Sequence, residues 1–278
     1  LRFFAQLDEA RPTWYTAVPT MHQAILNRSS RNKDIIERVG LRFLRSSSAS
    51  LPAPIMNELI DVFNAPVIEA YGMTEAAHQM CSNPLPPRAQ KPGAVGVAAG
   101  PDVGTASETS DVLLMAGQTG EIVINGPNVT PGYEGNPKAN EDNFFMADGK
   151  RWFRTGDQGA FDDEGYLRLT GRLKEIINRG GEKISPLEVD AVLLGHPEIA
   201  QIVCFGVLHP KLGEDIAAAV VLTEGSQLNE KDIRAFAAEH IANFKVPRSI
   251  MILEEIPKGP TGKIQRIGMA EKLGMTHE

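Results

Sequence analysis

The chain has 278 residues, a formal net charge of −7, 42% apolar residues and 23% charged residues. Its length suits about two domains at roughly 150 residues each, and its composition excludes a disordered, collagen-like or coiled-coil chain. The acidic balance argues against nucleic acid and a membrane surface as partners, because both require a basic face.

The cysteines and the chain ends carry few localisation signals. Cys81 and Cys204 form no Cys-x-x-Cys pair, so we expect neither a zinc ribbon nor a disulfide framework. No stretch approaches the ~18 apolar residues of a membrane span, and the start has no signal-peptide pattern. The last residues differ from a Ser-Lys-Leu peroxisomal signal, so we expect a cytoplasmic protein.

The first half predicts two layers. Apolar runs near 13–18, 41–44 and 66–70 predict strands, and a helix is expected over 52–63, which together indicate a parallel α/β layer. Ligands bind at the carboxyl ends of such strands. The segment 82–110 is rich in Pro and Gly and predicts a loop. Strands expected at 120–126 and 165–171 indicate a second, mostly β layer.

The pattern changes after Arg172. Ser185 suits a helix N-cap, Pro186 suits the first helical position and Glu188 completes a capping box. Apolar strands near 201–208 and 216–222, a helix from Ile233 to Ile241 and a strand near 249–253 then complete an αββαβ unit. We therefore expect two domains, 1–172 and 173–278.

The segment Tyr71-Gly72-Met73-Thr74-Glu75 lies where a strand is expected to become a helix. There the Thr74 hydroxyl can donate to a phosphate at the helix N-terminus, and Glu75 offers a carboxylate to magnesium. His78 is expected on the same helical face as Thr74. The alternative is an ordinary helix start with Thr74 as its N-cap.

Three further motifs carry chemistry. Asp157, after Gly156, can accept two hydrogen bonds from a ribose diol, although it could equally form a turn. The segments 171–175 and 178–183 combine cations with glycines and suit phosphate contact, or are simply solvated charge. Lys263 lies on a Pro- and Gly-rich loop, where a lone lysine is usually only a solubilising charge.

In this order the four motifs resemble the adenylate-forming superfamily of acyl- and aryl-CoA synthetases, the AMP-dependent synthetases and ligases. The resemblance spans nearly the whole chain. It implies an α/β fold: the C-terminal part of a large layered α/β adenylation domain with a β subdomain, followed by a small mobile α+β domain. It also implies an enzyme that makes an acyl-adenylate from a carboxylate and ATP with Mg2+, then rotates the small domain and transfers the acyl group to CoA.

The resemblance implies a role for each matching residue. Thr74 contacts phosphate, Glu75 binds Mg2+ and Lys263 is the adenylation lysine. The implied nucleotide site comprises Ser48, Ala49 and Ser50 on the adenine side, Glu69, Ala70, Tyr71, Gly72 and Met73 with Tyr71 stacked on the base, Asp157 on the ribose and Arg172 on ribose or phosphate. Lys174 falls at the hinge, and Gly180 and Gly181 line the CoA tunnel.

The segments 69–87, 91–93 and 179–186 are similar to plant and fungal oxalate-CoA ligases. This similarity implies a small carboxylic acid substrate, with oxalate as the acid, and an acid-thiol ligase activity. His78 is then a candidate for the acid's distal carboxylate, and Gly93 is assigned to the substrate site. The alternative for His78 is a surface histidine near the active site.

The family's Ser/Thr/Gly-rich phosphate loop with its lysine is expected well upstream of this region. The chain therefore resembles the C-terminal half of such an enzyme, and by itself lacks part of the nucleotide site. Two alternatives remain open. One is an adenylate-former for another acid, such as a fatty or aryl acid, or another acceptor, such as a carrier-protein thiol or, in luciferases, oxygen. The other is a catalytically incomplete fragment that only binds nucleotide.

Overall fold

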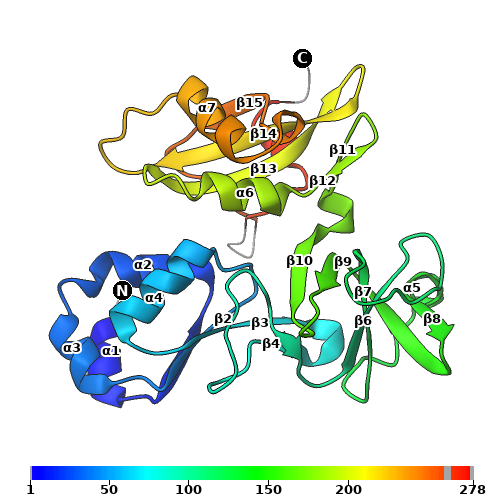
Figure 1. Cartoon of the computed structure of the whole chain (residues 1–278), viewed down its shortest axis with the longest axis horizontal. Helices are drawn as coiled ribbons and strands as arrows, with labels where there is room; N and C mark the ends of the chain where they lie inside the picture. Colours follow the sequence, from blue (N-terminus) through cyan, green and yellow to red (C-terminus); the bar gives the residue numbers. More distant parts are fainter. Residues whose placement is uncertain (1, 260–263, 276–278) are drawn as a thin grey trace. The chain divides into compact units, whose positions relative to one another are not determined.

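The computed structural model describes residues 2–259 and 264–275, and the chain divides into two compact units, 1–169 and 170–278 (Figure 1). The expected domain boundary, between 172 and 173, lies a few residues beyond this division. Among the described helices, none has the length and apolar character needed to cross a membrane.

The first sheet of unit 1 has its strands in sequence order. They are β1 (Trp14–Ala17), β2 (Phe43–Ser47), β3 (Val67–Met73), β4 (His78–Ser82) and β5 (Val97–Ala98). The first three strands are parallel, which confirms the predicted parallel layer, whereas β4 runs antiparallel to β3 and β5 antiparallel to β4. The carboxyl ends of β2 and β3 therefore share one edge of the sheet.

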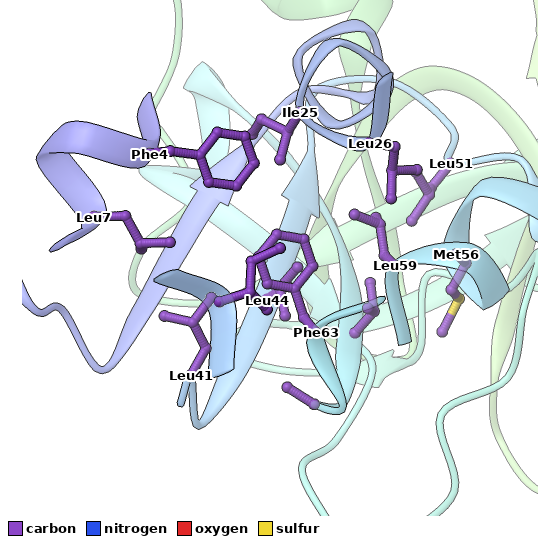
Figure 2. Close-up of a cluster of buried hydrophobic side chains, with 13 residues drawn as sticks. Phe4, Leu7, Ile25, Leu26, Leu41, Leu44, Leu51, Met56, Leu59 and Phe63 are labelled. Atoms are coloured by element: carbon purple, nitrogen blue, oxygen red, sulfur yellow. The ribbon is translucent and has the colours of Figure 1, made fainter. Parts of the chain in front are cut away.

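Four helices pack with this sheet around one apolar core. They are α1 (Phe3–Ala10), α2 (Pro19–Ser29), α3 (Lys33–Val39) and α4 (Ala53–Phe63). Figure 2 shows Leu44 of β2 beside Phe63 of α4, and helix residues such as Phe4 and Ile25 complete the cluster. The helix predicted over 52–63 is confirmed, and it ends where Asn64 adopts the left-handed conformation.

The second sheet of unit 1 is antiparallel. Its order is β10 (Leu167–Arg172), β9 (Lys150–Phe161), β7 (Gly120–Asn125) and β6 (Asp102–Ala106), and β8 (Phe144–Ala147), preceded by α5 (Pro137–Asn143), pairs with β9. The prediction of a loop over 82–110 is wrong in part, because β5 and β6 lie within it. Both strands are short and lie among glycines, so the local sequence signal for a strand is weak, and pairing with β4 and β7 decides the outcome.

Unit 2 confirms the predicted αββαβ order. Its elements are β11 (Ile177–Arg179), β12 (Glu182–Ile184), α6 (Pro186–Leu193), β13 (Ile199–His209), β14 (Gly213–Leu222), α7 (Glu230–His240), β15 (Ser249–Ile252) and α8 (Met269–Lys272). The sheet order is β12-β11-β14-β13, with β15 parallel to β14. The β11–β12 hairpin and α8 were not predicted. One face of the sheet packs on α6 and α7, and the other packs on Ile256, Ile264 and Met269.

At the start of α6, one of the two hydrogen bonds of the predicted capping box is present. Ser185 Oγ accepts a hydrogen bond from the Glu188 amide at 3.2 Å, so Ser185 is the N-cap. The Glu188 carboxylate does not complete a capping box but binds Lys245 Nζ at 2.6 and 2.8 Å. An ion pair with Lys245, which is distant in sequence, therefore replaces the predicted capping-box hydrogen bond of Glu188.

Candidate functional site

The strand β3 does not lead into a helix. It is followed by the 3-10 turn η1 (Thr74–Ala76), and the chain then returns as β4, with His78 opposite Met73. The predicted helix start at Thr74 is therefore wrong. At Gly72 a Cβ atom would lie 1.6 Å from the His78 carbonyl oxygen, so the close approach of the two strands requires glycine. Pairing of β3 with β4 therefore takes the place of a helix.

This turn exposes two of the predicted site residues. Thr74 and His78 are both exposed, and Glu75 is partly buried. His78 has a positive φ of 88° and opens β4, so it does not share a helical face with Thr74 as expected. The Thr74 hydroxyl and the His78 imidazole are nevertheless carried by one short turn at the carboxyl end of β3.

The Glu75 carboxylate is held by a residue that the sequence did not indicate. Tyr133 Oη donates a hydrogen bond to Glu75 Oε1 at 2.8 Å, and the Thr130 amide donates to the Glu75 carbonyl at 2.7 Å. Asn128 Nδ2 donates to the Ala76 carbonyl at 2.7 Å. Burial, together with the Glu75 carboxylate, raises the pKa of Tyr133 to about 12. A lone tyrosine on a loop offers no sequence signal for this contact.

Tyr71 and Asp157, which lie far apart in sequence, meet directly. Tyr71 Oη donates to Asp157 Oδ2 at 2.6 Å, and both residues are buried. Burial raises the pKa of Tyr71 well above its usual range, and the Asp157 charge raises it further. The structure therefore joins one residue expected at the base to one expected at the ribose.

Asp157 does not form a turn, which was the alternative to ribose binding. It belongs to the long strand β9 and follows Gly156, whose φ is +73° and whose amide donates to Glu121 Oε1 at 3.0 Å. The pairing of β7 with β9 shifts register beside this point. Such an irregularity re-aims a side chain, and here it accompanies the contact with Tyr71.

Arg154, three residues before Asp157 in β9, makes its contacts within the second sheet and the loop beside it. Its guanidinium donates to Glu121 Oε2 at 2.7 Å and to Asp111 Oδ1 at 2.8 Å, and it also bonds the carbonyls of Ser107 and Ser110. Its positive charge is thus matched by two carboxylates within unit 1.

The segment Ser48-Ala49-Ser50 is exposed and follows β2, with Ser48 at a φ of 74°. The Leu51 amide donates to Glu69 Oε1 at 2.9 Å. Glu69 is only 2% exposed, and burial raises its pKa to about 7. Because Ser47 pairs with Ala70, this segment and the turn after β3 lie at the same edge of the sheet.

Gly93 lies on a separate exposed turn. The Ala94 amide donates to the Lys91 carbonyl at 3.1 Å, and Lys91 Nζ pairs with Asp162 at 2.6 Å and Glu164 at 2.8 Å. These contacts fix the turn to the β9–β10 connection, and not to the turn that carries Thr74.

The remaining described site residues belong to unit 2. Arg172 and Lys174 are exposed, at the end of β10 and in the 3-10 turn η2 (Leu173–Glu175). Gly180 and Gly181 have φ values of +61° and +97° and form the two-residue turn between β11 and β12, a geometry that favours glycine at both positions. Lys263 lies outside the described residues.

Comparison with protein families identifies the class. The family described as AMP-binding enzyme matches residues 1–134, and the family described as AMP-binding enzyme C-terminal domain matches residues 188–263. The chain therefore belongs to the AMP-binding enzymes, which confirms the superfamily that its motifs resemble.

Individual relatives agree with the narrower resemblance. The chain is 50% identical over 265 residues to the oxalate-CoA ligase of Arabidopsis thaliana and 45% identical over 269 residues to that of Saccharomyces cerevisiae. These alignments cover 95% and 97% of this chain but 50% and 48% of the relatives, so the chain spans about half the length of the curated relatives it matches. ATP-bound MatB from Rhodopseudomonas palustris superposes with a TM-score of 0.88 at 29% identity, over 98% of this chain and 52% of MatB.

Proposed function

We propose that the protein carrying this chain is an ATP-dependent acid-CoA ligase that converts oxalate, ATP and CoA to oxalyl-CoA, AMP and pyrophosphate. The observation that carries the proposal is the turn after β3, which presents an exposed Thr74 beside a Glu75 carboxylate held by Tyr133. The identity of 50% and 45% to two oxalate-CoA ligases supports oxalate as the acid.

The residues of unit 1 suit MgATP. Among the described residues, no group of three or more His, Cys, Asp or Glu side chains could hold a metal ion. Mg2+ usually takes only one or two carboxylates and completes its shell with phosphate oxygens and water, so Glu75 fits as its protein ligand. Bound Mg2+ would neutralise phosphate charge, and the Thr74 hydroxyl would donate to a phosphate oxygen.

The nucleoside would lie along the shared edge of β2 and β3. The exposed backbone of Ser48-Ala49-Ser50 suits the adenine side, and the segment from Glu69 to Met73 forms the neighbouring strand end. The Asp157 carboxylate would accept hydrogen bonds from the ribose hydroxyls, with Tyr71 fixing its orientation. His78 would contact the distal carboxylate of the acid, and Gly93 would line the acid pocket.

The reaction has two displacements. In the first, a carboxylate oxygen of oxalate attacks the α-phosphorus of ATP and pyrophosphate leaves, with charge at the phosphate stabilised by Lys263. In the second, the CoA sulfur loses its proton and attacks the acyl carbon, and AMP leaves. We assign residues 1–172 to the large domain and 173–278 to the small one. Arg172 would contact ribose or phosphate, Lys174 would lie at the hinge, and Gly180 and Gly181 would face CoA.

The two half-reactions test this proposal in the full-length protein that carries the chain. Oxalate-dependent pyrophosphate exchange reports adenylation, and thioester formation from supplied oxalyl-AMP reports transfer. Lys263→Ala should lower exchange on the order of 10²-fold and spare transfer. Lys174→Pro should impair transfer more, because proline fixes φ at the hinge. Equal losses in both steps for Lys263→Ala would refute the division of labour.

A further inference from the structure

The segment that follows Lys263 is anchored by a partly buried arginine. The Arg266 guanidinium forms an ion pair with Asp190 of α6 through Nη2 and lies 3.6 Å from Glu175 Oε2 through Nη1. The three side chains are 18%, 10% and 15% exposed. Arg266 therefore joins the chain after 263 to a helix and to the turn η2.

Asp190 has a second partner besides Arg266. Asp190 Oδ1 accepts a hydrogen bond from the Cys204 amide at 2.7 Å, so the carboxylate also ties α6 to β13. Burial alone would lower the pKa of Arg266, but Asp190 and Glu175 outweigh it and keep the group cationic. Removing one partner of such a buried pair is strongly destabilising, because it leaves an uncompensated charge.

Two further contacts hold described residues on either side of 260–263. Lys258 and Ile264 form an antiparallel bridge, and Ile264 packs on the apolar cluster that contains Ile256 and Met269. Lys258, Ile264 and Arg266 are therefore all held by contacts within unit 2, and Arg266 lies three residues after Lys263 in the sequence.

We propose that Arg266 is a positioning residue for the adenylation step, acting by holding the chain beside Lys263 to Asp190 and to Glu175. The proposal rests on the proposed function, in which Lys263 acts in adenylation only. Because Glu175 directly follows Lys174, the same guanidinium links the hinge segment to the chain that carries the lysine. A misplacement of about 1 Å can cost about 10²-fold in rate, which sets the scale of the effect.

The test compares variants of the full-length protein in the two half-reactions. Arg266→Met and Asp190→Asn should lower oxalate-dependent pyrophosphate exchange by about 10- to 100-fold, while thioester formation from supplied oxalyl-AMP stays within about twofold of the parent. Arg234→Met removes an exposed arginine paired with Glu230 and should change neither reaction. Equal losses in both half-reactions, or unchanged exchange in a folded Arg266→Met variant, would overturn the positioning role.

A second readout does not depend on catalysis. Hydrogen exchange of the amides from 264 to 273 should accelerate at least tenfold in Asp190→Asn and remain unchanged in Arg234→Met. If Arg266→Met fails to fold, Arg266→Lys retains a cation but loses the two-armed guanidinium, and should show an intermediate loss of adenylation alone. A parent protein without oxalate-dependent exchange would refute the proposed function, whereas unchanged amide exchange in Asp190→Asn would refute the anchor.

Discussion

Tyr133 orients the proposed magnesium ligand through a single hydrogen bond to Glu75 Oε1. Tyr133→Phe keeps the ring and removes that hydrogen bond. The Glu75 side chain then has more conformational freedom, which Mg2+ binding must restrict. We expect adenylation to fall about 5- to 10-fold, equivalent to about 1 kcal/mol, and the Mg2+ concentration at half-maximal activity to rise. Pyrophosphate exchange measured across a magnesium titration checks this.

A matched control is Tyr15→Phe, which removes the hydroxyl that contacts His22 Nδ1 at 3.2 Å in the core of unit 1. Tyr15→Phe should lower the free energy of unfolding about as much as Tyr133→Phe does, but it should leave the magnesium dependence of pyrophosphate exchange unchanged. A Tyr133→Phe enzyme with the parent's magnesium curve would show that Glu75 needs no such support.

His78 is exposed on the turn after β3 and is the proposed contact of the distal carboxylate. His78→Ala should raise the KM for oxalate about 5- to 10-fold and leave the KM for ATP within about twofold, since only a ground-state contact to the acid is lost. Steady-state kinetics with each substrate varied in turn give both constants. His240→Ala, an exposed histidine on α7, should change neither, and an equal rise for ATP would contradict the assignment.

At the scale of elements, the pairing of β3 with β4 depends on Gly72. Gly72→Ala places a methyl group against the His78 carbonyl, so the hairpin must separate. We expect a loss of about 3 kcal/mol or more in unfolding free energy, together with loss of adenylation. Gly104→Ala is the control, because a Cβ there meets its nearest atoms at 3.8 Å. Thermal unfolding followed by circular dichroism compares them, and similar stabilities for the two variants would contradict the steric argument.

Much of the element order could be predicted from sequence. The parallel strands β1 to β3 and the αββαβ order of unit 2 follow from buried apolar runs separated by helical periods. The strand β4 could not be predicted, because the bonds that favour it over a helix come from β3 and β5 across the sheet. The same holds for β6, whose partner β7 lies beyond a long connection.

The site was predictable only as separate motifs. Sequence order placed Thr74 and Glu75 at a strand end, and the structure confirms that location but replaces the helix with a turn. The contact of Tyr71 with Asp157 spans two sheets, and that of Glu75 with Tyr133 joins a turn to a loop. Such contacts depend on tertiary packing, which local periodicity does not encode.

At the scale of the whole molecule, two buried titratable groups change the free energy of unfolding with pH in opposite directions. Burial lowers the pKa of His22 from 6.5 to about 4, so its contribution to stability is present above pH 6.5 and is lost as the pH falls. Burial raises the pKa of Glu69 from 4.5 to about 7, so its contribution is present below pH 4.5 and is lost as the pH rises. Each is worth at most about 3 kcal/mol, and between pH 4.5 and 6.5 they largely cancel.

Single variants should expose each contribution. For His22→Phe, the free energy of unfolding should be about 2 kcal/mol lower at pH 7 than at pH 5. For Glu69→Gln, it should be higher at pH 6.5 than at pH 4.5 by a similar amount. Urea unfolding followed by fluorescence reports on unit 1, because both tryptophans, Trp14 and Trp152, lie there. The exposed Glu58→Gln should follow the parent, and parallel curves for all variants would refute the opposing pair.

The turn between β11 and β12 has a backbone conformation that suits D-amino acids. Gly180 and Gly181 both have positive φ, which L-residues avoid and D-residues prefer for the same steric reason. A protein assembled by peptide ligation with D-alanine at these positions would keep the backbone path of the hairpin while adding a methyl group at each residue. Semisynthesis could therefore measure how closely a ligand approaches this hairpin without disturbing the turn, a distinction that no genetically encoded substitution can make.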